Sequence, residues 1–299
     1  MPNSHRLTKW TAADIPDQTG RTVVVTGANS GLGAVIATEL ARSGARVILA
    51  CRDTAKGEHV AAAMAGHVEV RRLDLADLDS VREFAAGLGV IAVLVNNAGV
   101  MAPPKRVTRD GFELQIGTNH LGHFALTGLL LDRITDRVVT MSSLAHRTGR
   151  IDLRDLNWEH RRYNRWQAYS QSKLANLLFT YELQRRLAAA GSTLRAVAAH
   201  PGYAATNLQS HTESIQDRLM TITNRLVAQS AQMGAVPALY AATVRELRGG
   251  SYVGPDGLFE QRGHAKIVES SKRSHDENTA ASLWTLSESL TGVAGTLTR

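Results

Sequence analysis

The sequence predicts an α/β fold in which helices cover both faces of one doubly wound, mostly parallel β-sheet. Short apolar runs alternate along the chain with longer helix-like segments. The apolar runs are continuous, which is typical of strands that are buried on both faces. A glycine-rich turn, TGANSGLG, follows the first of them. Ligands of such sheets bind beyond the carboxyl ends of the strands, so we expect the chemistry at that edge.

The elements follow one another in a regular order. The first strand reads TVVVT and the second RVILA, and the later ones are similar short runs; the expected strands are 22–26, 46–50, 68–73, 90–95, 137–141 and 194–199. Helical patterns separate them and recur near the end of the chain; the expected helices are 31–43, 54–65, 78–88, 111–134, 167–190 and 278–290. Because strand and helix alternate, right-handed crossovers are expected throughout.

Two segments interrupt this alternation. Residues 144–166 are polar and poorly periodic, and they are interpreted as an insertion. Residues of about 203–233 follow the last expected strand and are interpreted as a helical lid over the substrate. Neither resembles a separate domain, and the chain from about residue 269 is a polar tail. We therefore expect residues 1–299 to form a single catalytic domain.

Composition excludes several classes of protein. A chain of 299 residues with 43% hydrophobic and 20% charged residues is long enough and apolar enough for a buried core. The lone cysteine, Cys51, excludes an intrachain disulfide and a cysteine-based metal site, and it favours a reducing, cytoplasmic location. No apolar run approaches the roughly 18 residues that suggest a spanning helix, and the polar N-terminus does not resemble a signal peptide.

The net charge of +7 leaves three kinds of partner open: nucleic acid, an anionic surface or a phosphorylated small molecule. No nucleic-acid-binding motif is present, and the basic run 161–165 (RRYNR) is better interpreted as a solvated face of the insertion. His120 and His123 lie three apart on a helix, but no carboxylate spacing accompanies them. We therefore expect no metal site.

The glycine-rich turn predicts a nucleotide site. Gly27, Gly31 and Gly33 allow a sharp turn, and the next helix would offer free N–H groups to phosphates at its N-terminus. The turn lies on the first strand–helix junction, where a dinucleotide site requires it. No Lys-Ser/Thr pair follows the last glycine, so the turn is not a P-loop. Its GxxxGxG spacing also differs from the standard GxGxxG fingerprint.

With three further motifs, the chain resembles the short-chain dehydrogenase/reductase family from about residue 20 to about 260. The motifs are TGxxxGxG at 26–33, NNAG at 96–99, a serine at Ser143 and YxxxK at 169–173. The resemblance implies a Rossmann-type fold that binds a nicotinamide dinucleotide. It also implies hydride transfer between a carbonyl and an alcohol.

The resemblance implies which residues contact the cofactor. They are Gly27, Ser30, Gly31, Leu32, Gly33, Arg52, Asp74, Leu75, Asn96, Ala98, Gly99, Tyr169, Lys173, Pro201 and Thr206. Cys51 stands where NAD-preferring relatives have an acid, and Arg52 could pair with the 2′-phosphate of NADP, so NADP(H) is favoured while NAD(H) stays open. Arg52 could instead be a solvated charge. Asp53 and Asp74 could be helix N-caps.

The catalytic residues implied by the resemblance are Asn119, Ser143, Tyr169 and Lys173. Tyr169 and Lys173 lie four apart on one helix face, so the ammonium of Lys173 is expected to lower the pKa of Tyr169 from its usual value of about 10. Tyr169 would be the general acid in carbonyl reduction and the base in alcohol oxidation. Ser143 would bind the substrate oxygen, with Ser142 structural, and Asn119 would hold a water that links to Lys173.

Within the family, SSLAHRTGRIDLRDL and TRDGFELQIGTNHLGHFALT resemble the retinol dehydrogenase-like branch. That branch implies an apolar carbonyl or alcohol substrate, although the retinoid itself cannot be carried over. The interval of 26 positions between Ser143 and Tyr169 is longer than in most classical members. A non-catalytic dinucleotide sensor on the same fold is the alternative function. The sequence leaves open whether the chain forms a homo-oligomer.

Overall fold

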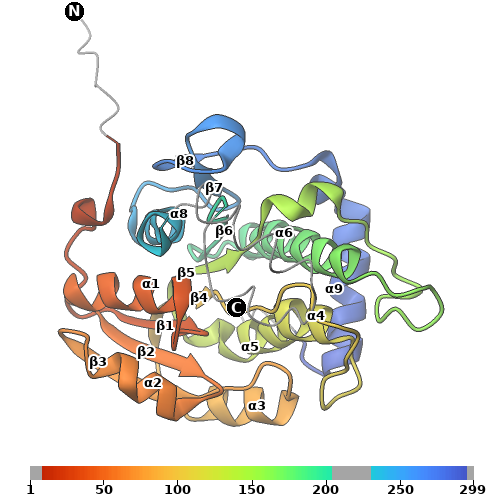
Figure 1. The fold of residues 1–299 in the computed structure, drawn as a ribbon, viewed down its shortest axis with the longest axis horizontal. Helices are drawn as coiled ribbons and strands as arrows, with labels where there is room; N and C mark the ends of the chain where they lie inside the picture. The colour runs from red at the N-terminus through yellow and green to blue at the C-terminus, as the bar shows by residue number, and fades with distance from the viewer. Residues whose placement is uncertain (1–8, 204–229, 295–299) are drawn as a thin grey trace, which may run out of the picture.

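The computed structural model describes residues 9–203 and 230–294, and these build an eight-stranded sheet (Figure 1). The strands lie in the order β3-β2-β1-β4-β5-β6-β7-β8. Their bounds are β1 Thr22–Thr26, β2 Arg46–Cys51, β3 His67–Arg72, β4 Ile91–Asn96, β5 Ile134–Met141, β6 Arg195–Ala199, β7 Tyr252–Pro255 and β8 Ala265–Ile267. Strands β1 to β7 pair in parallel, and β8 pairs antiparallel to β7. The strand order reverses between β1 and β4, where ligands bind in such sheets.

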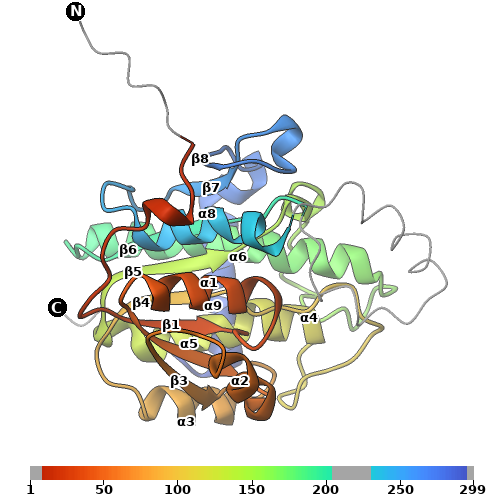
Figure 2. The same ribbon diagram turned by 60° about the vertical axis from the view of Figure 1, so that its left-hand side comes forward.

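Helices cover both faces of this sheet, as the sequence predicts. One face carries α1 (Gly31–Arg42) and α8 (Ala231–Thr243), which Figure 2 shows side by side. The opposite face carries α3 (Leu78–Ala86), α5 (Gly122–Leu130) and α6 (Arg165–Ala189). The remaining α-helices of the described chain are α2 Thr54–Ala61, α4 Leu114–Ile116 and α9 Glu277–Thr291, the last packed against α6.

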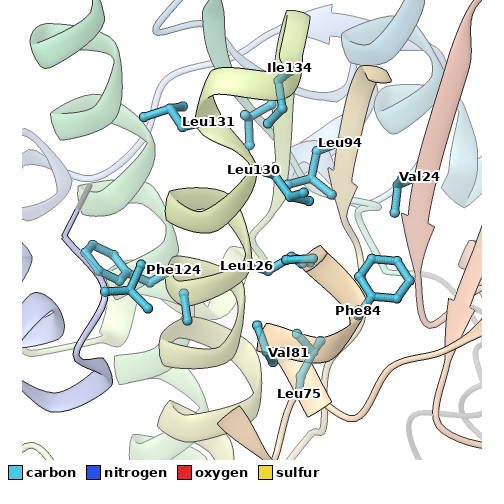
Figure 3. Close-up of a cluster of buried hydrophobic side chains, with 14 of the residues drawn as sticks. Val24, Leu75, Val81, Phe84, Leu94, Phe124, Leu126, Leu130, Leu131 and Ile134 are labelled. Atoms are coloured by element: carbon cyan, nitrogen blue, oxygen red, sulfur yellow. The ribbon is translucent and has the colours of Figure 1, made fainter. Parts of the chain in front are cut away.

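Two apolar clusters hold the layers together. Val24 and Leu94 of the sheet pack against Phe84 of α3 and Leu126 of α5 on one face (Figure 3). On the other face the buried side chains of α1 and α8 pack against the alternate residues of the same strands. Each fully buried Leu or Phe stabilises the fold by about 1.5–3 kcal/mol. Continuous apolar strands therefore predict a sheet that is covered on both sides, as observed.

Some element boundaries were predicted wrongly. The helix expected at 111–134 is instead a short α4, a π-helical turn at Gly117–Leu121, α5 and a 3₁₀ turn, and β5 begins at Ile134. Strands β7 and β8 were not predicted, because YVGP and AKI are too short and, in β7, too rich in Gly and Pro to read as strands.

The structure describes the insertion but not most of the expected lid. The insertion starts with a 3₁₀ helix, Leu144–Thr148, and continues in turns up to Asn164, the N-cap of α6. Most of the lid, residues 204–229, lies outside the described residues. Within residues 9–203 and 230–294, no helix is both long and apolar enough to cross a membrane.

Candidate active site

A cleft of about 580 Å³ opens beyond the carboxyl ends of the central strands. The segments that follow the parallel strands β1 to β6 all contribute residues to its lining. The lining includes Gly27, Ser30, Gly31, Leu32 and Gly33 after β1, Arg52 after β2, Asp74 and Leu75 after β3, Ala98 and Gly99 after β4, Ser142 after β5, Tyr169 and Lys173 on α6, and Pro201 after β6. The structure thus brings most of the predicted cofactor residues together in one hollow.

The glycine turn forms the floor of the cleft. Gly27 and Gly31 have φ angles of +66° and +54°, a left-handed conformation that favours glycine. A Cβ on Gly33 would lie 2.4 Å from the carbonyl oxygen of Gly27 and 2.6 Å from Nδ2 of Asn97. The turn therefore leaves no room for a side chain at Gly33, and the N-terminus of α1 borders the cleft directly. This cradle fits the pyrophosphate of a dinucleotide.

Two cations lie at the end of the cleft beside β2. Arg52 and Lys56 are exposed side chains that both line it, and Cys51 beside them is buried. Burial, with Asp53 and Glu58 nearby, raises the pKa of the Cys51 thiol to about 11, so the thiol stays neutral. The position that carries an acid in NAD-preferring relatives is therefore uncharged here.

The N-cap alternative holds for Asp53 but not for Asp74. Asp53 is the N-cap of α2, because its carboxylate accepts from the backbone N–H of Lys56 at 3.0 Å. Asp74 is not an N-cap, so that alternative was wrong: Asp77 caps α3 by accepting from Asp79 and Ser80. Asp74 lines the cleft and accepts from the N–H of Ala76 at 3.0 Å.

Three of the four residues of the NNAG segment line the cleft. Asn97, Ala98 and Gly99 line it, and Asn97 Nδ2 donates to the carbonyl of Thr26 at 2.8 Å. Asn96 is only 1% exposed and is not among the lining residues. Its Nδ2 donates to Thr127 Oγ1 at 3.0 Å, so its side chain connects β4 to α5.

The proposed catalytic side chains meet where β5 ends against α6. Ser143 lies close enough to Tyr169 for its hydroxyl to lower the pKa of the phenol. Lys173 Nζ lies 5.7 Å from the centroid of the Tyr169 ring and donates to the carbonyl of Met141 at 3.2 Å. Ser142 donates to the carbonyl of Lys173 at 2.9 Å, in line with its predicted structural role. The long interval before Tyr169 therefore does not separate Tyr169 from Ser143.

The expected direction of the Tyr169 pKa was wrong for the protein without a cofactor. Burial raises the pKa of Tyr169 to about 12, and a hydrogen bond from Ser143 offsets only part of this. Burial also lowers the pKa of Lys173 to about 8. Desolvation disfavours the charged form of each group. At neutral pH Tyr169 therefore holds its proton, and most Lys173 is an ammonium.

Asn119 lies in the π-helical turn and is fully buried. Its Oδ1 accepts from the N–H of Val100 at 2.8 Å, and its Nδ2 donates to the carbonyl of Val100 at 2.9 Å. A Cβ on Gly99 would lie 3.1 Å from Asn119 Oδ1 and 3.5 Å from Lys173 Nζ. The side chain of Asn119 therefore fixes the chain after β4 directly beside Lys173.

Three outcomes complete the comparison with the sequence. Thr206 lies outside the described residues. Among residues 9–203 and 230–294, no group of three or more His, Cys, Asp or Glu could hold a metal ion. The sequence reasoning also missed cleft residues, notably Asn29, Lys56 and Arg106. Lys56 could have been found from its position four residues after Arg52.

Comparison with known proteins agrees with this geometry. The family model of the short chain dehydrogenases matches residues 21–217. Human retinol dehydrogenase 13 is 46% identical over 292 residues, which cover 92% of this chain and 85% of that protein. Human retinol dehydrogenase 12 is 42% identical and covers 92% of this chain and 87% of its own length.

Solved structures give the same picture. A crystal structure of an uncharacterized protein from Mycobacterium paratuberculosis is 60% identical, with a TM-score of 0.86, and it covers 97% of this chain and 100% of its own. A structure from Beutenbergia cavernae is described as an NAD(P)-dependent gluconate 5-dehydrogenase with NADP bound at low occupancy. It is 28% identical, with a TM-score of 0.58, and it covers 76% of this chain and 91% of its own.

Proposed function

Because the chain belongs to the short-chain dehydrogenase family, and is thus an NAD(P)-dependent oxidoreductase acting on CH–OH groups, we propose that it interconverts an apolar carbonyl and its alcohol with NADP(H). One observation carries the proposal. Tyr169 and Lys173 lie one helical turn apart on α6 and both line the cleft that the glycine turn borders, with Ser143 close enough to lower the pKa of Tyr169.

Tyr169, Ser143 and Lys173 each have a separate role in the proposed reaction. The reduced nicotinamide, when bound, supplies the hydride. Tyr169 holds a proton at neutral pH, because its pKa is about 12, and donates it to the carbonyl oxygen during reduction. The Ser143 hydroxyl donates a hydrogen bond to the same oxygen and stabilises the negative charge that develops there. Lys173 is a nearby cation that favours the phenolate left behind.

The preference for NADP(H) rests on charge. Arg52 and Lys56 line the cleft just after β2, and both could pair with a 2′-phosphate. The neutral Cys51 thiol supplies no carboxylate to bind a free 2′-hydroxyl. The gluconate dehydrogenase relative, described with NADP, is consistent with this choice.

An apolar substrate is supported by the relatives, since both human proteins are named for retinol, an apolar alcohol. The identity of the substrate is not part of the proposal. A cytoplasmic location stays a prediction.

The proposal is tested with a panel of straight-chain and cyclic aldehydes and ketones of increasing length. Consumption of NADPH and of NADH is followed by the loss of cofactor fluorescence. We expect turnover with NADPH, with kcat/KM rising as the carbonyl becomes longer and more apolar. Tight NADPH binding with no turnover across the whole panel would contradict the proposal and favour the dinucleotide sensor.

A further inference from the structure

A buried histidine connects the cofactor cradle to Asn119. His123 is 1% exposed, and its two ring nitrogens contact different elements. Nδ1 lies 3.1 Å from the carbonyl oxygen of Asn119, and Nε2 lies 2.9 Å from Thr26 Oγ1. Thr26 is the last residue of β1 and directly precedes Gly27 of the glycine turn.

The hydrogen bonds around Thr26 determine which nitrogen of His123 carries the proton. Thr26 Oγ1 accepts from the N–H groups of Asn97 and Ala98, both at 2.9 Å. These two bonds use the acceptor capacity of the hydroxyl, so it can only donate its own proton further. Nε2 of His123 takes that proton at 2.9 Å, whereas the competing carbonyl of Val95 is at 3.4 Å. Nε2 is therefore an acceptor.

The protonation of the other ring nitrogen, Nδ1, follows from the same hydrogen bonds. In a neutral ring whose Nε2 accepts, Nδ1 carries the hydrogen, and a carbonyl oxygen such as that of Asn119 can only accept it. Burial lowers the pKa of His123 to about 4, so the ring is neutral at neutral pH. One directed chain of hydrogen bonds therefore runs from Asn97 and Ala98 through Thr26 and His123 to Asn119.

We propose that His123 is a positioning residue: it locks the π-helical turn that carries Asn119 to the cofactor cradle at Thr26, and so keeps Asn119 beside Lys173. Without it, the carbonyl of Asn119 loses its Nδ1–H partner and the hydroxyl of Thr26 loses its best acceptor. The inference rests on the proposed function, because Lys173 has its role there and the family resemblance implies that Asn119 acts beside it.

His146 repeats this arrangement at Ser143. It is fully buried, and its Nδ1 lies 2.6 Å from the carbonyl oxygen of Ser143. Its Nε2 accepts from the backbone N–H of Ser271 at 3.1 Å, which fixes the same tautomer. Asn119, beside Lys173, and Ser143, which the proposed reaction uses, are thus each held through the backbone carbonyl by a neutral histidine three or four positions later.

His120 provides the contrast. It is 2% exposed, and its Nε2 lies 2.9 Å from Ser287 Oγ. Ser287 donates its proton to the carbonyl of Leu283 at 2.7 Å, so Nε2 of His120 must be the donor. His120 therefore has the opposite tautomer and contacts α9 instead of the cofactor cradle. It lies one turn from His123 and serves as its matched control.

The tautomers can be measured independently of activity. In protein labelled with ¹⁵N-histidine, the ring nitrogen shifts of the 11 histidines separate Nδ1–H, Nε2–H and charged forms, and single variants assign His120 and His123. At neutral pH we expect Nδ1–H for His123 and Nε2–H for His120. A charged His123, or an Nε2–H tautomer there, would overturn the proposal even if the enzyme is fully active.

Kinetics then test the positioning role. His123→Phe keeps the ring volume and removes both hydrogen bonds, and we expect kcat for carbonyl reduction to fall about five- to tenfold, with a smaller change in NADPH affinity. His123→Asn keeps a donor at the Nδ1 position and should recover at least half of this loss. His120→Phe should keep kcat within about twofold of the wild type.

The outcomes separate this inference from the function itself. If the wild type has no turnover, the proposed function fails, and the tautomer measurement alone decides the inference. If the wild type is active, an unchanged kcat in His123→Phe overturns the positioning role. The same holds if His120→Phe loses as much activity as His123→Phe, or if His123→Asn recovers none of it.

Discussion

Replacing Arg52 by glutamine tests the basis of the cofactor preference. The side chain lines the cleft directly after β2, and the change removes one charge while it keeps a polar, though shorter, side chain. A hydrogen bond to a charged group contributes about 1.5–3 kcal/mol. Arg52 is exposed, which places its contribution toward the lower end. We therefore expect NADPH affinity to fall about tenfold, since 1.4 kcal/mol corresponds to that factor.

The assay is a fluorescence titration of NADPH and NADH into the wild type and the variants. NADH has no 2′-phosphate, so Arg52→Gln should change the affinity for NADH by no more than about twofold. The preference for NADPH over NADH should therefore shrink by about tenfold, the factor by which NADPH affinity falls. Higher salt should weaken NADPH binding more than NADH binding in the wild type. Arg162→Gln is the control, because Arg162 is exposed but does not line the cleft.

Two results would refute this reasoning. One is equal affinity of the wild type for the two cofactors. The other is an unchanged NADPH affinity in the double variant of Arg52 and Lys56, both changed to glutamine, because those are the two cations that line the cleft beside β2.

Three further predictions follow from the packing and the buried groups. Gly33→Ala should weaken NADPH binding at least tenfold, because its Cβ would lie 2.4 Å from the Gly27 carbonyl, while Gly89→Ala, which meets nothing within 4 Å, should bind normally in the same titration. Asp77→Ala should lower the free energy of unfolding by about 1 kcal/mol in urea, since Asp77 caps α3. Burial lowers the pKa of His120 to about 3 and of His123 to about 4, so the unfolded chain binds protons first as the pH falls below about 6.5. Each histidine should therefore lower the free energy of unfolding by about 2 kcal/mol at pH 5 relative to pH 7. A free energy of unfolding that does not change between these two pH values, in the wild type and in His120→Phe alike, would contradict this.

The sequence predicted the sheet well where burial is complete. The runs TVVVT and RVILA are β1 and the first five residues of β2, since the interior of a strand covered on both faces is mostly apolar. The sequence did not predict β7 and β8, which form one edge of the sheet and have only four and three residues. Such short strands owe their conformation to pairing with distant segments, and a local pattern carries no information about that.

The long helix expected at 111–134 failed for a different reason. Its apolar pattern continues through the π-helical turn at Gly117–Leu121 and into the start of β5 at Ile134. A single turn with one extra residue barely changes the spacing of apolar residues, so periodicity does not detect it. That turn carries Asn119, and its hydrogen bonds to Val100 and His123 could be found only in three dimensions.

The motifs predicted the identity of the proposed catalytic residues but not their electrostatics. Spacing alone placed Tyr169 and Lys173 on one helix face, as the structure confirms. The direction of the Tyr169 pKa was wrong, because the burial of both side chains is a property of the folded chain. Similarly, the three aspartates of DLADLD look alike in sequence, and only the start of α3 at Leu78 selects Asp77 as its N-cap.

The most direct test of the central claim is to compare NADPH binding and carbonyl reduction in the wild type and in Tyr169→Phe. The substitution removes one hydroxyl from a buried side chain that is 7% exposed, and it leaves the glycine cradle untouched. If Tyr169 donates the proton, NADPH should bind within about twofold of the wild-type affinity while kcat falls at least about a hundredfold. Full turnover by Tyr169→Phe would contradict the account.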